Sequence, residues 1–476
     1  MTLRAGRPTG FSLAHSAPFV LSILAACGTA HEEAARAERV FLITCDTLRA
    51  DRLGTYGHEY ETSPRLDALA RESVVFDRAY SGAPSTLPSM CSLLTGRLPA
   101  NIGVEHNRGF LHGNVTTLAE ALSAQGIATA AVVSNWVLLN PATMPDSFGV
   151  RQGFDHFDGE LPSRELVRGM PERRAIDTTD AAIAWLEGQS DLDQRFFLWV
   201  HYQDPHGPYT PPARFVEMMK RPPSDEKRLP FGQDQNGRGA IPLYQRLGNA
   251  SHPDFYRTRY DAEVRFFDQH VGRLLDYVKS RDLFDDALVI FTADHGESLG
   301  ENGYWFCHGE TLSQELLRVP FFVRYPSGLR PGNETQGRSE RLVSSLDIWP
   351  TVMQALDLSP GTFSGTSLME PPPERSVAVQ TLGFERNASV FAVTDGRYRL
   401  YLKGDEAVGL FDLEQDPAEV TNLFRKRPEV INGLVEGYAS LNARDEGPRF
   451  QSRSRELSED EEEILQGLGY TSGKDE

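Results

Sequence analysis

The residues best suited to chemistry are acids, imidazoles and one hydroxyl that stand close to short apolar runs. Asp46 follows one such run, and the pair Asp294 and His295 follows another. Because the carboxyl ends of parallel strands meet at one edge of a sheet, these side chains can come together there. Two carboxylates, one imidazole and a hydroxyl suit a single Ca²⁺, Mn²⁺, Mg²⁺ or Zn²⁺ ion. The sequence therefore predicts a site for one divalent metal at this edge, with candidate ligands in Asp46, Thr86, the group His201, Asp204 and His206, and the pair Asp294 and His295.

Thr86 lies where a helix is expected to begin. Pro88 suits the first turn of a helix, and Gly96 suits its end. The N–H groups and the dipole at a helix N-terminus favour an anion. A divalent metal would lower the pKa of the Thr86 hydroxyl, which could then attack a phosphorus or sulfur centre. The alternative is that Thr86 only caps the helix.

Two further histidines are candidates for the proton that a leaving group needs. His206 comes shortly after a third apolar run, and His308 follows the Asp294 motif by fourteen positions. Either imidazole could protonate a departing oxygen. Each could equally be an ordinary core or surface histidine, so the hypothesis depends on several strand ends carrying suitable atoms together.

The apolar runs have the length and composition of buried strands and alternate with helical patterns. This alternation predicts an α/β fold, a doubly wound and mostly parallel sheet with helices on both faces. Beyond residue 375 the pattern changes to short alternating stretches, which predict a smaller antiparallel sheet with a helix. The expected strands of the main sheet are 40–45, 128–133, 196–200, 287–291 and 319–323, and the expected helices include 63–73, 117–126, 179–188 and 256–279.

The first residues are typical of an export signal. A basic start and a short apolar run precede Leu24-Ala25-Ala26-Cys27, which resembles a bacterial lipoprotein box. The resemblance implies cleavage before Cys27, a lipid anchor on its thiol, and an extracytoplasmic protein on a membrane. An ordinary secretory signal is the alternative. We expect a signal peptide over 1–26, a linker over 27–38, a catalytic domain over 39–374 and a C-terminal subdomain over 375–476.

Composition excludes some classes of protein. The formal net charge is −19 and the pI is about 5.1, which disfavours a nucleic-acid partner. Four cysteines without a CxxC spacing indicate neither a disulfide framework nor a zinc finger. Residues 210–253 are rich in proline, glycine and charge, as expected of a long insertion of the kind that often forms a lid. The acidic tail 456–476 is expected on the surface.

Several motifs together resemble the sulfatase family of the alkaline-phosphatase superfamily, from about residue 39 to the C-terminus. The resemblance implies a metal, Ca²⁺ in that family, held by Asp46, Asp294 and His295, with the nucleophile at Thr86. It also implies substrate contacts from Asn135, His201 and Arg49. The matching motifs are Asp46-Thr47-Leu48-Arg49-Ala50-Asp51-Arg52-Leu53-Gly54, Pro88-Ser89, Leu93-Leu94-Thr95-Gly96-Arg97, Asp204-Pro205-His206, Asp294-His295-Gly296-Glu297, Asp347-Ile348-Trp349-Pro350-Thr351 and Leu410-Phe411-Asp412-Leu413-Glu414-Gln415-Asp416-Pro417.

The sequence departs from the family pattern at the nucleophile. The usual sulfatases carry Cys or Ser at the position of Thr86 and convert it to formylglycine, a route that threonine cannot follow. The arginine of the same motif is Met90 here. Threonine nucleophiles are similar to those of phosphodiesterases and phosphoryl transferases of the superfamily.

Other departures affect metal and substrate binding. A second aspartate ligand of the family is Thr47 here, and a Gly-Lys-Trp-His segment aligns with 134–137, leaving Asn135 and Val137. A lysine of the later glycine-rich stretch aligns with Cys307, beside His308.

The favoured hypothesis is a metal-dependent hydrolase of sulfate or phosphate esters, with metal-bound Thr86 as the nucleophile. Its substrate would be a sulfated or phosphorylated small molecule, glycan or lipid. One alternative is a transferase that passes a phosphoryl-linked head group to a glycan or lipid. The other is a sulfatase-like binding protein that has lost its chemistry.

Overall fold

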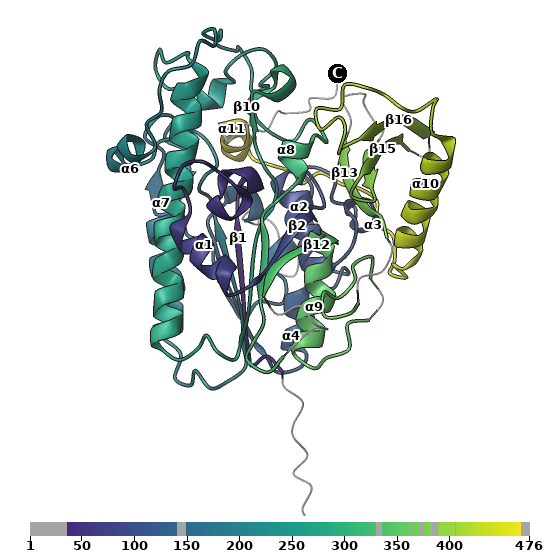
Figure 1. Cartoon of the computed structure of the whole chain (residues 1–476). Coiled ribbons are helices and arrows are strands. Elements are labelled where there is room, and N and C mark those ends of the chain that lie inside the picture. Colours follow the sequence, from purple (N-terminus) through teal and green to yellow (C-terminus); the bar gives the residue numbers. More distant parts are fainter. Residues whose placement is uncertain are drawn as a thin grey trace, which may run out of the picture. The chain divides into compact units, whose positions relative to one another are not determined.

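An eight-stranded sheet forms the centre of the fold in the computed structural model, which describes residues 36–139, 149–329, 336–361, 363–371, 375–382, 389–404 and 406–467. The strand order is β12-β2-β11-β8-β1-β7-β3-β4 (Figure 1). The predicted signal peptide, the linker up to residue 35 and the lipidation site Cys27 lie outside the described residues. The strands of this sheet are β1 (Arg39–Cys45), β2 (Val74–Tyr80), β3 (Ala128–Val133), β4 (His156–Asp158), β7 (Phe196–Tyr202), β8 (Ala287–Ala293), β11 (Phe321–Arg324) and β12 (Gly337–Ser344).

All neighbouring strands of the sheet pair in parallel except at β11, which runs antiparallel to both β8 and β2. In the centre, Cys45 at the end of β1 is in register with Ala293 of β8 and Tyr202 of β7. Every residue of these three strands is buried, since helices cover both faces of the sheet. The predicted mostly parallel α/β sheet is confirmed, and the end of β1 lies beside the ends of both its neighbours.

Helices pack in two groups, one on each face of the sheet (Figure 1). The long helix α7 contacts α1, α5 and α6, whereas α2 contacts α3, α4 and α9. One face of α7 is apolar and buried, from Val264 to Val278. The helices are α1 (Pro64–Arg71), α2 (Thr86–Thr95), α3 (Pro99–Ile102), α4 (Leu118–Ser123), α5 (Ala175–Glu187), α6 (Ala213–Met218), α7 (Pro253–Ser280), α8 (Gln314–Leu317) and α9 (Ile348–Ala355).

Helix α2 begins one residue earlier than the sequence predicts. Ser85 is the N-cap in extended backbone, and Thr86 is the first helical residue instead of the residue before the helix. Gly96 ends the helix in the left-handed conformation with φ of 65°, which glycine adopts without the steric cost of a Cβ. In α4, Thr117 and Glu120 form the predicted capping box.

Three strands of the main sheet were not predicted. In β2, Asp77 and Arg78 interrupt the apolar pattern, because this part of the strand is only half-buried and the two charges reach solvent. Strand β12, at the edge of the sheet, begins with mostly polar and charged residues, and β4 is three residues long. Edge strands carry a weaker apolar signal because one side meets solvent. Two short hairpins complete the strands, β5 (Ser163–Arg164) with β6 (Pro171–Glu172), and β9 (Ser298–Leu299) with β10 (Trp305–Cys307).

The C-terminal part forms the predicted small antiparallel sheet with a helix. Its strands are ordered β13-β14-β15-β16, and α10 (Pro428–Ala443) contacts three of them. The strands are β13 (Val377–Leu382), β14 (Ser389–Thr394), β15 (Tyr398–Lys403) and β16 (Glu406–Asp412).

The sequence predicted that the acidic tail lies on the surface, but part of it is buried. It forms helix α11 (Glu459–Gly467), in which Leu465 is fully buried in the core cluster of the main sheet. Glu462 on the same helix makes an ion pair with Arg108. Two apolar residues, Ile464 and Leu465, after a run of acids are a weak signal in sequence, so the docking of this helix was missed. The predicted boundary at residue 375 stays a prediction.

No helix in residues 36–467, apart from the stretches not described, combines the length and the apolar character that crossing a membrane requires.

A buried ion pair joins the segment after α10 to the start of α3, and its loss should destabilise the protein. Asp445 accepts hydrogen bonds from Arg97 Nε at 2.9 Å and from Asn101 Nδ2 at 2.7 Å, and the side chains of Arg97 and Asp445 are 7% and 1% exposed. Asp445→Asn leaves the guanidinium buried without its counter-charge, so the free energy of unfolding should fall by about 3 kcal/mol.

The control removes a carboxylate from an exposed pair. Glu429 pairs with Arg427 where both side chains are more than half exposed, so Glu429→Gln should change stability little. Urea unfolding followed by circular dichroism compares the two variants with the wild type. Equal midpoints for Asp445→Asn and Glu429→Gln would contradict this account.

Candidate active site

Two aspartates stand at the carboxyl ends of the central strands. Asp46 follows β1 and Asp294 follows β8, and both are completely buried. The backbone N–H of Asp294 donates to the Cys45 carbonyl at 3.1 Å, and that of Asp46 donates to the Tyr202 carbonyl at 2.9 Å. These bonds extend the pairing of the sheet by one residue, so the two carboxylates are placed side by side by the register of three parallel strands.

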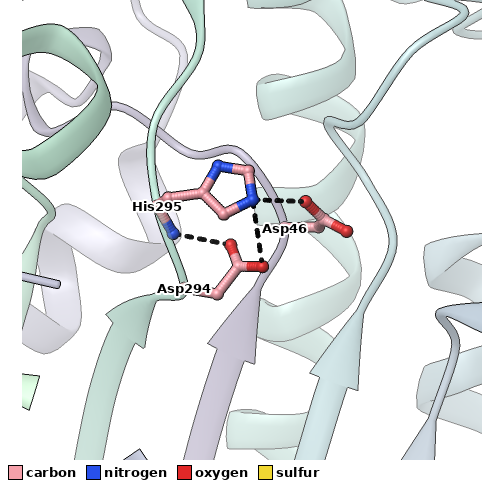
Figure 2. Close-up of side chains that lie close together, drawn as sticks. All are labelled: Asp46, Asp294 and His295. Atoms are coloured by element: carbon pink, nitrogen blue, oxygen red, sulfur yellow. Dashed lines mark hydrogen bonds and ion pairs between the residues drawn. The ribbon is translucent and has the colours of Figure 1, made fainter. Parts of the chain in front are cut away.

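His295 completes a cluster of three possible ligands (Figure 2). Its Nε2 lies 3.8 Å from Asp46 Oδ1 and 3.5 Å from Asp294 Oδ2. The other carboxylate oxygens are already bonded, because Asn135 Nδ2 donates to Asp46 Oδ2 and the N–H groups of Thr47 and His295 donate to Asp294 Oδ1. Asp46 Oδ1 and Asp294 Oδ2 have no hydrogen-bond partner among the described residues.

The buried charges of Asp46 and Asp294 favour binding of a cation. Burial and the neighbouring charge of Asp294 raise the pKa of Asp46 well above its usual value, and burial raises the pKa of Asp294. Two unpaired carboxylate oxygens and an imidazole nitrogen, all fully buried and within 4.8 Å of one another, are the donors that a divalent cation prefers. The residues present therefore fit a divalent metal.

Thr86 presents its hydroxyl to this cluster. Its Oγ1 lies 3.4 Å from His295 Nε2, and the residue is completely buried. Helix α2 is fixed on the sheet edge because Ser89 Oγ donates to the Asp294 carbonyl at 2.6 Å, and because Asn107 Oδ1 accepts from the Leu87 N–H at 2.9 Å. The first turn of the helix is thus fastened to the aspartate whose carboxylate lies in the cluster.

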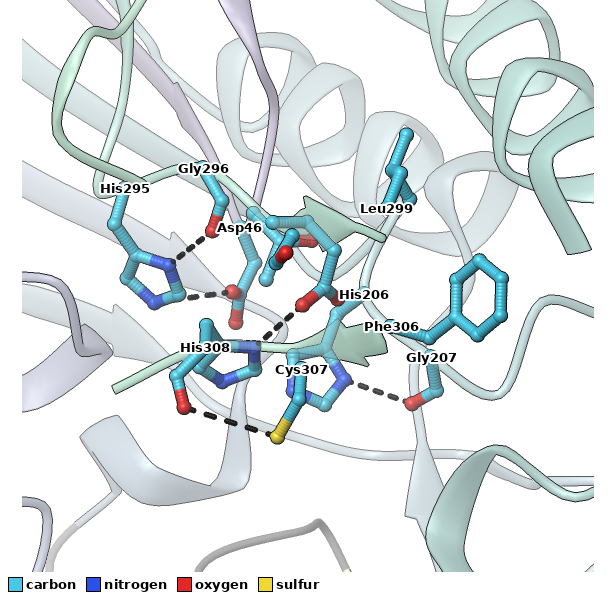
Figure 3. Close-up of polar contacts among 12 residues, drawn as sticks. Asp46, His206, Gly207, His295, Gly296, Leu299, Phe306, Cys307 and His308 are labelled. Atoms are coloured by element: carbon cyan, nitrogen blue, oxygen red, sulfur yellow. Dashed lines mark hydrogen bonds and ion pairs between the residues drawn. The ribbon is translucent and has the colours of Figure 1, made fainter. Parts of the chain in front are cut away.

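Two more imidazoles, those of His206 and His308, lie close to His295 (Figure 3). The ring of His308 lies 4.6 Å from the ring of His295 and 5.2 Å from that of His206, between ring centroids. His206 Nδ1 is 2.8 Å from the carbonyl of Gly207, which fixes Nδ1 as a donor. His206 and His308 are 6% and 8% exposed, whereas Thr86 has no exposed surface, so the histidines lie nearest to solvent.

The carboxyl group of Glu297 contacts the imidazole of His308. Its Oε1 lies 3.2 Å from His308 Nδ1, and its Oε2 accepts a hydrogen bond from the Tyr209 hydroxyl at 3.0 Å. Burial raises the pKa of Glu297 to about 8, and burial together with the neighbouring imidazoles lowers the pKa of His206 and His308 well below the usual value. Both imidazoles are therefore neutral at pH 7 until an anion arrives.

His201 and Arg49 have other partners. His201 Nδ1 is 2.9 Å from Thr44 Oγ1, and its Nε2 is buried with no hydrogen-bond partner among the described residues. The Arg49 guanidinium bonds both oxygens of Asp51, Glu301 Oε1 and the Glu297 carbonyl. Its hydrogen bonds connect the loop after β1 to the loop after β8, and substrate contact by either residue stays a prediction.

Sequence reasoning gave no role to three residues that shape the site. Glu297 and Tyr209 form the support behind His308, and Thr47 holds Asp294 through its N–H. The signal for Glu297 was its place in the Asp294-His295-Gly296-Glu297 motif, where Gly296 is required because a Cβ would lie 1.9 Å from the Glu315 carbonyl. Tyr209 gave no such signal, because only the folded chain brings it to Glu297.

Comparison with known proteins is consistent with this site. A family model described as sulfatase matches residues 38–358. An arylsulfatase of Clostridium perfringens is 24% identical over 86% of this chain and 95% of its own, and a choline-sulfatase of Rhizobium meliloti is 26% identical over 81% and 82%. The crystal structure of a phosphonate monoester hydrolase of Agrobacterium radiobacter is similar with a TM-score of 0.68, 22% identity, and coverage of 88% of this chain and 100% of that chain.

The contact between Glu297 and His308 should control both the orientation of the His308 ring and the rate of ester turnover. Without the carboxyl group, His308 loses the partner that holds Nδ1 and orients the ring. Glu297→Ala should lower ester turnover about 10- to 100-fold, because it removes the partner that orients a side chain of the site. Glu297→Gln keeps a hydrogen-bond acceptor and should keep most of the rate.

The ¹⁵N chemical shifts of His308 report its tautomer directly. We expect a single tautomer of His308 in the wild type and in Glu297→Gln, and a mixture in Glu297→Ala. An unchanged tautomer and an unchanged rate in Glu297→Ala would show that the contact has no such role.

Proposed function

Because this chain belongs to the sulfatase family and is an ester hydrolase, we propose that it cleaves its substrate by attack of the Thr86 hydroxyl, supported by a divalent metal. The general activity, hydrolysis of sulfate or phosphonate esters, follows from the family. The nucleophile, the metal requirement and the substrate class are the proposal.

The observation that carries the proposal is the position of Thr86. Its oxygen lies 3.4 Å from His295 Nε2, beside the two carboxylate oxygens that lack partners. A structural N-cap would use its hydroxyl on the backbone of its own helix, but the N-cap of α2 is Ser85. The hydroxyl of Thr86 instead faces the catalytic cluster.

Asp46, Asp294 and His295 would hold the divalent cation. When bound, this ion supplies Lewis-acid chemistry, by which it lowers the pKa of a nearby hydroxyl and offsets charge on an ester oxygen. Asn135 supports the cluster, because its amide holds Asp46 Oδ2 and thereby leaves Oδ1 toward the site.

The reaction takes place in two displacements at the same atom. The Thr86 hydroxyl releases its proton to solvent, and its oxygen forms a bond to the sulfur or phosphorus as the bond to the leaving oxygen breaks. The leaving oxygen takes a proton from a protonated histidine. Water then attacks the same centre and gives one proton back to the histidine, and the bond to Thr86 breaks to return its deprotonated oxygen. The products are an alcohol or phenol and the free acid anion.

His308 is the better placed of the two candidate acids. The carboxyl group of Glu297 lies against His308 Nδ1 and would stabilise the imidazolium that forms, whereas His206 Nδ1 lies against the uncharged carbonyl of Gly207. The negative charge of a bound substrate would raise the pKa of His308 and bring a proton to it.

The charge of the site favours a substrate with a singly charged ester group. A divalent cation would balance Asp46 and Asp294, leaving little positive charge for a doubly charged phosphate. Three positions where the family carries Arg, His or Lys hold the buried, uncharged side chains of Met90, Val137 and Cys307. Sulfate esters, phosphodiesters and phosphonate monoesters carry one charge, and the relatives named arylsulfatase and choline-sulfatase fit this class.

Substitution of Thr86 tests the nucleophile. Thr86→Ala should lower kcat by about 10³-fold or more, because it removes the hydroxyl that lies against His295 Nε2, and Thr86→Ser should stay within about tenfold of the wild type. The panel comprises nitrophenyl sulfate, bis-nitrophenyl phosphate, nitrophenyl phenylphosphonate and nitrophenyl phosphate, each with Zn²⁺, Mn²⁺ or Ca²⁺. Nitrophenyl phosphate should be the poorest substrate.

Equal rates for Thr86→Ala and the wild type would remove Thr86 from the mechanism. Turnover that appears only when a second alcohol is supplied would support the transferase alternative instead.

Leaving groups of different acidity test the acid. Nitrophenolate departs without a proton, whereas an alkoxide needs one. His308→Ala should therefore lower kcat/KM for an alkyl ester at least tenfold more than for the nitrophenyl ester of the same acid, and His206→Ala should affect the two esters more equally. The reverse order would assign the proton transfer to His206.

A lipid anchor at Cys27 remains part of the proposal for location, supported by the sequence Leu24-Ala25-Ala26-Cys27. In a bacterial host, wild-type protein should sediment with membranes and incorporate labelled palmitate, and Cys27→Ala should do neither. Palmitate on Cys27→Ala would contradict the assignment.

A further inference from the structure

The loop of the β5–β6 hairpin carries an arginine that is paired along one edge of its guanidinium. Arg168 Nε donates to Glu165 Oε2 at 2.9 Å, and Arg168 Nη2 donates to Glu165 Oε1 at 2.6 Å. Arg168 Nη1 is buried and has no hydrogen-bond partner among the described residues. A buried N–H group without an acceptor is unfavourable, and an anion is the strongest acceptor for a guanidinium. Nη1 is therefore a donor that an anionic ligand could satisfy.

Arg168 lies close to one of the two candidate acids. Its guanidinium carbon is 5.7 Å from the centre of the Tyr244 ring, and that ring centre is 6.1 Å from the centre of the His206 ring. The charge of Arg168 reaches His206, because it adds to burial and to the imidazoles of His308 and His295 in lowering the pKa of His206. A single aromatic ring thus separates the guanidinium from an imidazole of the site.

Tyr244 holds this arrangement in place. The residue is 1% exposed, and its hydroxyl donates to the Phe306 carbonyl at 2.8 Å. Phe306 belongs to β10, which ends one residue before His308. Tyr244 itself lies in the insertion 210–253, so this insertion and the β5–β6 hairpin meet beside the two histidines.

The order of these groups places Arg168 on the side of the leaving group. The ester group belongs beside Thr86, and the leaving oxygen has to reach His308 or His206 to take a proton. Arg168 contacts the ring next to His206, so it would meet a more distant part of the leaving group and not the ester itself.

From this geometry we propose that Arg168 binds a second anionic group, carried by the leaving alcohol or phenol of the substrate. The preferred substrate is then an ester whose leaving group bears a carboxylate, a sulfonate or a further sulfate. The inference deepens the proposed function and rests on it, because it takes the ester to Thr86 and the leaving oxygen to the histidines. Nη1 offers its N–H groups from one atom, so an oxygen of any of these anions can accept from it.

The tip of the hairpin can move to admit such a group. Leu166 and Val167 are 82% and 45% exposed, so they pack little against the rest of the protein. A segment with few buried apolar contacts moves at low cost. The side chain of Arg168 is 16% exposed, which places it at the boundary between the site and solvent.

Binding to the Thr86→Ala protein tests recognition apart from turnover. The ligands are sulfate and methylphosphonate esters of para-hydroxyphenylpropanoate, of its sulfonate counterpart and of its neutral primary amide, measured by calorimetry with the divalent metals of the panel above. A saturated chain separates the variable group from the ring, so the three phenols have nearly equal acidity. Both acidic esters should bind at least about tenfold more tightly than the amide ester.

Variants of the hairpin identify the residue responsible. Arg168→Gln, added to Thr86→Ala, should bind the acidic and amide esters about equally. Glu165→Gln breaks the same ion pair but keeps the guanidinium, and should retain the preference for the acidic esters. Arg164→Gln removes an exposed arginine of the same hairpin and should also retain it. If Arg168→Gln alone fails to fold, the double variant Glu165→Gln/Arg168→Gln removes both buried charges and should show the same loss.

The inference and the proposed function can fail separately. A preference for the acidic esters that survives Arg168→Gln, or that is absent while Arg168 is present, would overturn the inference. An equal loss in Glu165→Gln would assign the effect to the structure of the hairpin and would overturn it as well. Wild-type protein that binds the acidic esters through Arg168 but hydrolyses none of them would contradict the proposed function and leave the inference. Hydrolysis with equal kcat/KM for acidic and amide esters would do the reverse.

Discussion

Two carboxylates buried side by side are the constraint on which the rest of the site depends. The register of β1 and β8 leaves Asp46 and Asp294 adjacent and away from solvent, and one oxygen of each has no hydrogen-bond partner in the part of the chain that the structure describes. Like charges in such a place are unfavourable unless a cation lies between them. The surrounding contacts serve this arrangement, because Asn135 and the N–H of Thr47 hold the outer oxygens and thereby direct the inner ones toward a common point.

The same geometry supports the proposal that Thr86 is the nucleophile. Helix α2 begins at Thr86 and is tied to the backbone of Asp294 through Ser89, so the hydroxyl cannot drift from the carboxylates. Glu297 contacts His308, the proposed acid. Nucleophile, cation site and acid thus come from different segments, yet each is fastened to the ends of the central strands.

Much of this could be predicted from sequence, because the strongest signals are local. Continuous apolar runs gave the buried strands, and the residues after them gave Asp46, Asp294 and His295. The edge strands β4 and β12 were missed because their residues meet solvent. Tyr209 and the docked helix α11 were missed because their contacts join segments far apart in the chain. The pairing of Glu297 with His308 also required the folded chain, since only the return of β10 toward β9 brings the two together.

The most direct measurement of the central claim is the mass of the peptide that contains Thr86 after the enzyme is quenched in acid during turnover of a saturating ester. The account predicts a peptide heavier by one sulfuryl or phosphoryl group, with fragmentation placing the added mass on Thr86 and not on Ser85 or Ser89. A burst of leaving group without any modified Thr86 peptide would contradict attack by this hydroxyl, and would leave direct attack by water as the mechanism.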